Sequence, residues 1–184
     1  MEPATTRWAR IGKTNRKWLI HLPPGGLCLS AFVLVRNRRG AVLFGRPRPH
    51  RNWPERGGVG VWRIRELARE GEWALPATHL MIHEDPAQAA VRIAKRWGGV
   101  TDPHPRLVGI DSCRLPTGLW KGSGRTRRRV YHWAIGFVYE LTTLRPRKKD
   151  PGWAELRFVP TDQLRSLRIG RGHRDFLKYL TPSP

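Results

Sequence analysis

Apolar and polar segments alternate at the start of the chain in a way that predicts a β-hairpin. Residues 27–35 (LCLSAFVLV) are apolar and rich in strand-forming side chains, as expected of a buried strand. The polar run 36–40 (RNRRG) ends in glycine, which is typical of a turn, and residues 41–45 form the returning strand. The predicted hairpin therefore exposes a basic tip between two buried strands.

The second half of the chain predicts a further pair of strands. Residues 106–113 are expected to form one strand, and residues 130–141 (VYHWAIGFVYEL) another, because large and small side chains alternate along them. Between them, residues 115–129 are basic and contain glycine, which predicts an exposed loop.

The C-terminal segment predicts a last strand followed by helices. Residues 153–160 are expected to form the strand, and Thr161 is a suitable N-cap for a helix that follows it. Residues 173–180 predict a final short helix that buries Phe176, Leu177 and Leu180.

One helix with well-marked ends is predicted within the stretch 75–100. Asp85 can cap its start, and Pro86 is tolerated in a first helical turn. Gly98 and Gly99 are expected to end it, because a left-handed residue can close the last turn. The segment before the helix, which begins at Leu75-Pro76, is predicted to be a loop.

The predicted helix has an apolar face and a basic face. Residues at helical spacing form the apolar face: Ala89, Ala90, Ile93, Ala94 and Trp97. Arg92 and Arg96 lie four residues apart and share a neighbouring face. Upstream, His79, His83 and Glu84 form an H-x3-H-E pattern. On a helix, two histidines four residues apart share a face and can bind zinc together. These residues precede the predicted helix, so no metal site is predicted.

Length and composition predict one domain. The 184 residues suffice for a buried core, and we expect a domain at 27–184 after a basic extension at 1–26, with a Pro/Gly-rich insertion at about 47–72. No apolar run is long enough to span a membrane, and the N-terminus lacks the apolar core of a signal peptide. With only Cys28 and Cys113, no disulfide framework is predicted, and a cytoplasmic location is expected.

The charge predicts an anionic partner. Lys and Arg number 35 against 14 Asp and Glu, which gives a net charge of +21. A GC-rich coding bias explains Arg over Lys but not the scarcity of acids. Such a field attracts polyanions, and we expect RNA rather than DNA. The candidate contacts are clustered in turns and loops: Arg36, Arg38, Arg39, Arg125, Arg127, Arg128, Arg129, Arg147, Lys148 and Lys149.

The stretch 78–100 resembles a Nudix box, G-x5-E-x7-R-E-U-x-E-E-x-G-U, where U is aliphatic. On this chain the first Gly falls on Thr78, the first Glu on Glu84, the Arg on Arg92, and the final pair on Gly99 and Val100. The opening hairpin and the segment 155–164 (ELRFVPTDQL) also resemble the family. The resemblance implies an α/β/α sandwich with a mixed β-sheet, with the box helix on one face and a C-terminal helix on the other.

The resemblance also implies that the metal-binding acids are lost. In the family the helix glutamates hold magnesium; here their positions carry Ile93, Arg96 and Trp97. Magnesium needs several oxygen ligands, and Glu84, the only retained box acid, cannot coordinate it well alone. An arginine can instead bind phosphate directly. We therefore expect a degenerate box that binds a nucleotide, phosphate ligand or RNA without efficient hydrolysis and without a cofactor. The candidate ligand-binding residues are Arg92, Arg96, His79, Glu84, Trp73 and Trp97.

The sequence leaves three alternatives open. The chain would be an atypical, active Nudix hydrolase of a nucleoside diphosphate derivative if Glu84 held Mg²⁺ or Mn²⁺ together with acids outside the helix; the candidates are Glu66, Glu70, Glu140 and Glu155. The second alternative is a ribosome- or RNA-associated structural protein. The third is that the helix only packs, with Arg92 and Arg96 solvated. For Arg92 alone, the family resemblance also implies a positioning role, in which it pairs with Glu84. A homodimer is compatible with each.

Overall fold

The computed structural model describes residues 27–48, 71–81, 84–120, 128–143, 152–170 and 172–180. The predicted extension at 1–26 and residues 49–70 of the predicted insertion lie outside these ranges. The described elements, in chain order, are β1 (Leu27–Arg36), β2 (Val42–Pro47), β3 (Ala77–His79), α4 (Pro86–Arg96), β4 (Arg106–Trp120), β5 (Arg128–Thr142), β6 (Trp153–Val159) and the 3₁₀ helices η1 (Thr161–Arg165) and η2 (Arg174–Tyr179). None of the helices in these ranges is long and apolar enough to cross a membrane.

The strands form one mixed sheet around β1. The strand order is β4-β5-β1-β2-β6, and β3 pairs with β1 off this path. β1 and β5 run parallel, in register from Leu27↔Trp133 to Arg36↔Thr142, whereas the remaining pairs are antiparallel. The predicted hairpin is confirmed, and Gly40 at its turn has a φ of 76°, which a residue with a side chain rarely adopts. β1 is thus the strand that the rest of the sheet is built on.

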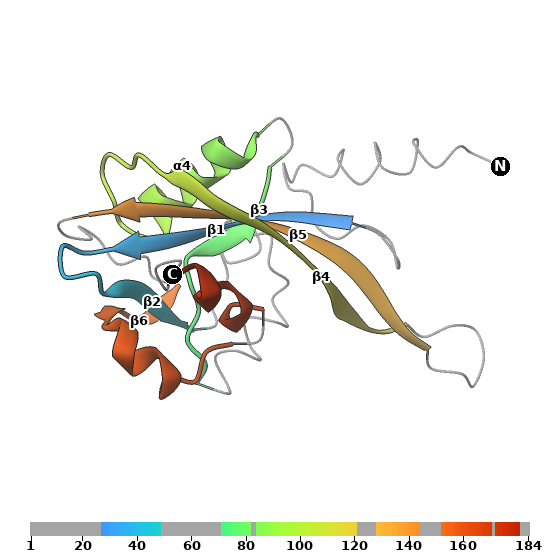
Figure 1. Cartoon of the computed structure of the whole chain (residues 1–184). Coiled ribbons are helices and arrows are strands. Elements are labelled where there is room, and N and C mark those ends of the chain that lie inside the picture. Colours follow the sequence, from blue (N-terminus) through green and yellow to red (C-terminus); the bar gives the residue numbers. More distant parts are fainter. Residues whose placement is uncertain are drawn as a thin grey trace.

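Two apolar cores cover the two faces of the sheet. One core packs α4 through Ala89, Ala90, Ile93, Ala94 and Trp97 onto β1 and β5. The other packs Leu164, Phe176 and Leu180 from the 3₁₀ helices and adjoining residues onto Leu34, Phe44 and Val138. Figure 1 shows α4 on one side of the strands and the C-terminal helices on the other. The predicted α/β sandwich with a mixed sheet is confirmed, with 3₁₀ helices as its second helical layer.

Glycine in β2 allows the end of α4 to sit close to the sheet. A Cβ on Gly45 would lie 2.3 Å from the ring of Trp153, so only glycine fits below that indole. The indole Nε1 of Trp153 donates to the carbonyl of Trp97 at 3.2 Å, and the two rings meet edge to face. The last turn of α4 is therefore fixed over the β2–β6 side of the sheet.

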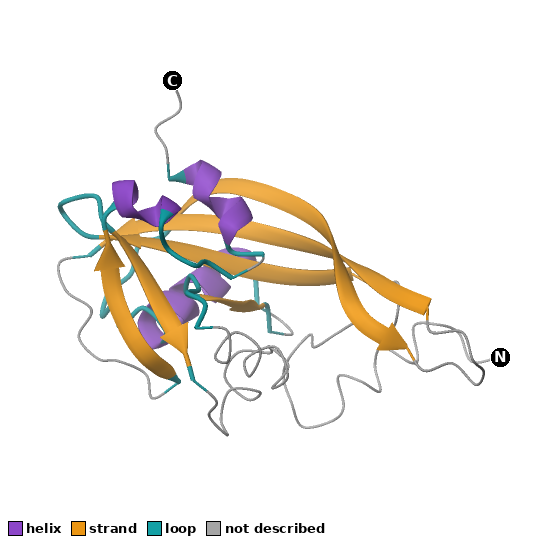
Figure 2. Cartoon of the chain, turned by 90° about the horizontal axis from the view of Figure 1, so that it is seen from below, coloured by secondary structure: helices purple, strands orange, loops and turns teal. Residues whose placement is uncertain are grey.

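Three local predictions were wrong. β4 runs to Trp120 and β5 starts at Arg128, so the ends of the predicted loop 115–129 are strand; residues 121–127 lie outside the described ranges. Strand pairing across the whole hairpin outweighs the local glycine and basic composition, and Figure 2 shows this pair extending beyond the other strands.

The other two errors concern residues whose conformation depends on their neighbours in space. Residues 77–79 form β3, rather than loop, because they pair with β1. At the C-terminus, Thr161 is not a cap: the N-cap of η1 is Pro160, and no side chain caps that end. The short 3₁₀ turn is held by the burial of Leu164 instead.

Candidate functional site

The start of α4 is fixed by a complete capping box. The Asp85 carboxylate accepts from the backbone N–H of Gln88 at 2.8 Å, and the Gln88 side chain accepts from the backbone N–H of Asp85 at 3.1 Å. Pro86 occupies the first turn, and Gly99 beyond the end has a φ of 65°, as predicted. Burial, and to a lesser extent the charge of Asp85, raises the pKa of the Tyr139 phenol above its usual value. Tyr139 also belongs to the core beneath α4, so local hydrogen bonds and core packing both hold the helix start in place.

Arg92 and Glu84 form a fork-to-fork ion pair at the side of α4. Arg92 Nε donates to Glu84 Oε1 and Arg92 Nη2 to Glu84 Oε2, both at 2.6 Å. The same Nη2 donates to the His79 carbonyl at 3.0 Å, and the backbone N–H of Met81 donates to Glu84 Oε2 at 2.8 Å. The two side chains are only 16% and 11% exposed. Arg92 therefore ties β3 and the segment before α4 to the helix, and it engages both oxygens of Glu84.

The residues beside Arg92 on α4 separate into buried apolar groups and exposed cations. Ile93 is 0% exposed and Trp97 1% exposed, and both lie in the core beneath the helix. Lys95 and Arg96 are exposed in the last turn, where positive charge also favours the helix C-terminus. Between Ile93 and Trp97, the exposed surface of α4 therefore carries two cations and no acid.

The two predicted indoles do not come together. Trp97 belongs to the core on the α4 side of the sheet, whereas Trp73 belongs to the core on the opposite side, where it is 7% exposed. His79 lies in β3, and its backbone carbonyl is the group that meets Arg92. The structure thus brings together Arg92, Glu84 and His79 and buries both tryptophans away from solvent.

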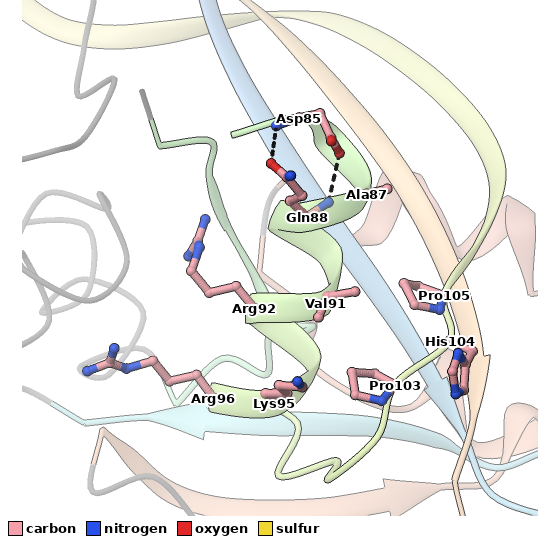
Figure 3. Close-up of a pocket in the computed structure, with 10 residues that line it drawn as sticks. All are labelled: Asp85, Ala87, Gln88, Val91, Arg92, Lys95, Arg96, Pro103, His104 and Pro105. Carbon is pink, nitrogen blue, oxygen red and sulfur yellow. Dashed lines mark hydrogen bonds between the residues drawn. The ribbon is translucent and has the colours of Figure 1, made fainter. Parts of the chain in front are cut away.

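A shallow hollow of about 950 Å³ follows the exposed surface of α4. Figure 3 shows Arg92 and Arg96 extending to one side of the helix and the segment 103–105 lying on the other. The lining combines cations and small apolar groups: Asp85, Ala87, Gln88, Val91, Arg92, Lys95, Arg96, Pro103, His104 and Pro105. Arg92 and Arg96 thus line the opposite side of the helix from the apolar residues, so a ligand that met both would have an anionic part on one side of α4 and an apolar part on the other (Figure 3).

Of the acids named outside the helix, Glu140 and Glu155 lie within the described residues, on the sheet face opposite α4. Glu140 pairs with Arg36 and, at 3.1 Å, with Arg106. Its neighbour two residues earlier on β5, Val138, lies in the core opposite α4, so Glu140 shares that face. Glu66 and Glu70 lie outside the described residues, as does His83. Within the described ranges, no three His, Cys, Asp or Glu side chains gather as metal ligands would.

The predicted nucleic-acid contacts divide into four groups. Arg36 is engaged inside the fold by Glu140 and by the carbonyls of Gly40 and Leu180, at 3.2 and 3.1 Å. Arg38 and Arg39 are exposed at the hairpin turn, as expected. Arg128 and Arg129 lie in β5 rather than in a loop. The others lie outside the described residues: Arg125, Arg127, Arg147, Lys148 and Lys149.

Sequence reasoning missed one cluster, which we call the Trp73 cluster: Trp73, Arg46, Arg157 and Glu155. Glu155 pairs with Arg46 at 3.3 Å and with Arg157 at 3.5 Å. The guanidinium carbons of Arg157 and Arg46 lie 4.6 and 5.9 Å from the centroid of the Trp73 ring. The sequence holds only a weak signal for it, the i, i+2 spacing of Glu155 and Arg157 on one strand face. Arg46 and Trp73 come from other segments.

Comparison with known proteins identifies the fold. No family sequence model and no curated protein sequence matches the chain. The MutT protein from Methanosarcina mazei Go1 matches in structure with a TM-score of 0.57 at 15% identity, over 87% of this chain and 96% of that one. A Nudix hydrolase from M. smegmatis gives 0.51 at 24% identity, over 84% of each chain.

A third structure is informative because of its ligand. The NUDIX domain of Shewanella oneidensis NrtR, solved in complex with ADP ribose, gives a TM-score of 0.50 at 11% identity, over 83% of this chain and 85% of that one. Together these structures show that the chain has the Nudix fold. The resemblance stated from the sequence is confirmed at the level of the fold.

Proposed function

We propose that this Nudix-fold chain binds a nucleotide-type phosphate ligand on the surface of α4 and does not use a divalent metal to hydrolyse it. One observation carries the proposal. Arg92 engages both oxygens of Glu84, and the residues at the family's three helix-acid positions are the buried Ile93 and Trp97 and the cationic Arg96.

These residues do not fit a magnesium ion. Mg²⁺ takes octahedral oxygen ligands, usually including one or two carboxylates. Ile93 and Trp97 offer no oxygen, and Arg96 adds positive charge where a cation would bind. Glu84 would have to leave a nearly buried ion pair with Arg92. Leaving a buried charge without its partner costs about 3–5 kcal/mol. The residues on and before α4 therefore disfavour metal-assisted hydrolysis.

The same surface supports anion binding without a metal. Arg96 offers a planar, permanently charged group that binds phosphate oxygens in pairs, and Lys95 adds a second cation in the same turn. Val91 and Pro105, which are partly exposed, provide an apolar surface in the same hollow, of the kind that receives a base. A Nudix domain of this fold, that of NrtR, binds ADP ribose. In this proposal Arg92 positions the segment before α4, and it is Arg96 that contacts the ligand.

The hydrolase alternative has little support among the described residues. It needs carboxylates from outside α4, but Glu140 is paired with Arg36 and Arg106, and Glu155 with two arginines of the Trp73 cluster. Both acids lie on the sheet face opposite α4.

Calorimetric titration with ADP ribose tests the proposal. The full chain is expected to bind equally well, within about twofold, in EDTA and in magnesium. Replacing Arg96→Glu is expected to weaken binding by about tenfold or more, because one charge-assisted contact with phosphate contributes about 1.5–3 kcal/mol. Arg174→Glu is the matched control, since Arg174 is exposed on η2 across the sheet.

Three results would overturn the proposal. The first is binding that disappears in EDTA. The second is release of AMP from ADP ribose in magnesium or manganese that Glu84→Gln abolishes, since this would make Glu84 a metal ligand in catalysis. The third concerns the place of the ligand. Equal losses in Arg96→Glu and Arg174→Glu would place the ligand elsewhere and reject α4 as its site.

A further inference from the structure

We infer that the Trp73 cluster is a second anion-binding surface, which takes the phosphate backbone of single-stranded nucleic acid. The cluster lies across the sheet from α4, where Glu155 and Arg157 share a face with Val159 and Arg46 pairs in register with Glu155. It is therefore separate from the hollow on α4, and its residues are not among those that the charge pattern of the turns suggested.

The two arginines of the cluster are held in place before any ligand arrives. The Arg157 guanidinium lies 4.6 Å from the Trp73 ring centroid and that of Arg46 lies 5.9 Å from it, both within the range of a cation–π interaction. The indole itself is fixed, because it is 7% exposed and its backbone N–H donates to the Arg168 carbonyl at 2.8 Å. Arginines that are already ordered lose little side-chain entropy on binding.

Charge in the cluster is not balanced. Two guanidinium groups share the single carboxylate of Glu155, through Arg46 Nη2 to Oε2 and Arg157 Nε to Oε1. Each guanidinium has five N–H donors, so one carboxylate cannot satisfy both groups. Arg46 and Arg157 remain 45% and 55% exposed. The cluster thus presents a net positive charge and a surplus of donors to solvent.

The geometry favours nucleic acid as the ligand. Trp73 is too buried to receive a base, but the exposed guanidinium groups of Arg46 and Arg157 offer planar faces to a base and N–H donors to phosphate. Arg46 lies on β2, and Glu155 and Arg157 lie on β6, which is the edge strand of the sheet in the part of the chain that the structure describes. No described strand beyond β6 therefore blocks a strand of nucleic acid. The net charge of +21 adds long-range attraction for such a polyanion.

Fluorescence anisotropy with a labelled poly(U) RNA of about 20 nucleotides tests the inference in the full chain. The double variant Arg46→Gln with Arg157→Gln is expected to bind on the order of tenfold more weakly. Its affinity should also depend less on salt, with the slope of log K against log salt smaller by about 0.7 for each phosphate that the variant no longer neutralises. Titration with ADP ribose should be unchanged, which separates this inference from the proposed function.

A matched control removes the same charge elsewhere. Arg106→Gln with Lys178→Gln also deletes two exposed cations that pair with acids, Glu140 at 3.1 Å and Asp111 at 2.6 Å. This control is expected to change RNA affinity by less than about twofold. A third variant, Arg46→Lys with Arg157→Lys, keeps the charge but removes the planar group, and it should bind more weakly than the natural chain.

The outcomes decide the matter. Weaker binding by the Gln and Lys pairs, beside an unchanged control, supports the inference. Equal losses in the Gln pair and the control mean that only the overall field acts, which overturns it. Unchanged binding by the Lys pair, or no RNA binding by the natural chain, overturns it as well.

Discussion

Arginine meets glutamate in two contrasting ways on the two faces of this sheet. On the α4 side, Arg92 and Glu84 form a matched pair with two contacts of 2.6 Å, and both side chains are nearly buried. On the other side, Arg46 and Arg157 share Glu155 through longer contacts of 3.3 and 3.5 Å, and all three are well exposed. The charges of Arg92 and Glu84 balance within the fold. In the Trp73 cluster, two arginines and one glutamate leave a net positive charge at the surface.

The difference separates arginines that are expected to act on stability from arginines that the proposals assign to a ligand. Removing either partner of a buried pair leaves an uncompensated charge, so Arg92 and Glu84 are expected to act on stability. Exposed pairs contribute little to stability, because water and salt screen them. Arg46 and Arg157 are consequently available for a ligand, and Arg96, exposed one turn after Arg92, shares that property.

The largest expected effect is the loss of the buried pair. Arg92→Met should lower the free energy of unfolding by about 3 kcal/mol, because Glu84 would remain nearly buried without its cation. Arg96→Met, one turn further along the same helix, is the control and should change stability by less than about 0.5 kcal/mol. Urea unfolding followed by tryptophan fluorescence measures both. Similar small losses in the two variants would contradict the contrast between the faces.

A smaller effect is expected at the cap of α4. Asp85→Ala should lower the free energy of unfolding by about 1 kcal/mol, since it removes the acceptor for the Gln88 N–H. Asp102→Ala is the comparison variant, because Asp102 is 83% exposed and its only role among the described contacts is an exposed pair with His104. Thermal unfolding of both variants shows whether the helix start matters; an unaffected Asp85→Ala protein would argue that packing alone holds α4.

The smallest effect is expected on the other face. Arg46→Gln with Arg157→Gln should change the free energy of unfolding by less than about 1 kcal/mol, as exposed ion pairs and exposed cation–π contacts contribute little. The same urea titration used for Arg92→Met provides the measurement. A loss as large as that of Arg92→Met would mean that the Trp73 cluster is a structural element and that the two faces are alike.

Local signals in the sequence were sufficient for much of the fold. The hairpin turn at Gly40, the cap at Asp85 and the end of α4 at Gly99 each depend on residues next to one another in the chain. Prediction failed where pairing with another segment outweighed the local composition. β3 is a strand because β1 pairs with it, and the β4–β5 hairpin is long because its two strands support each other across it.

The candidate site divides in the same way. The sequence by itself determined the first hairpin, the helix with its apolar and basic faces, and the absence of acids at positions 93, 96 and 97, because hydrophobic period and residue identity are local properties. Tertiary structure decided that Arg92 is taken by Glu84, that both candidate indoles are buried, and that Arg46, Trp73 and Arg157 meet. Burial and charge pairing depend on which distant segments pack together, and that is fixed only when the sheet forms.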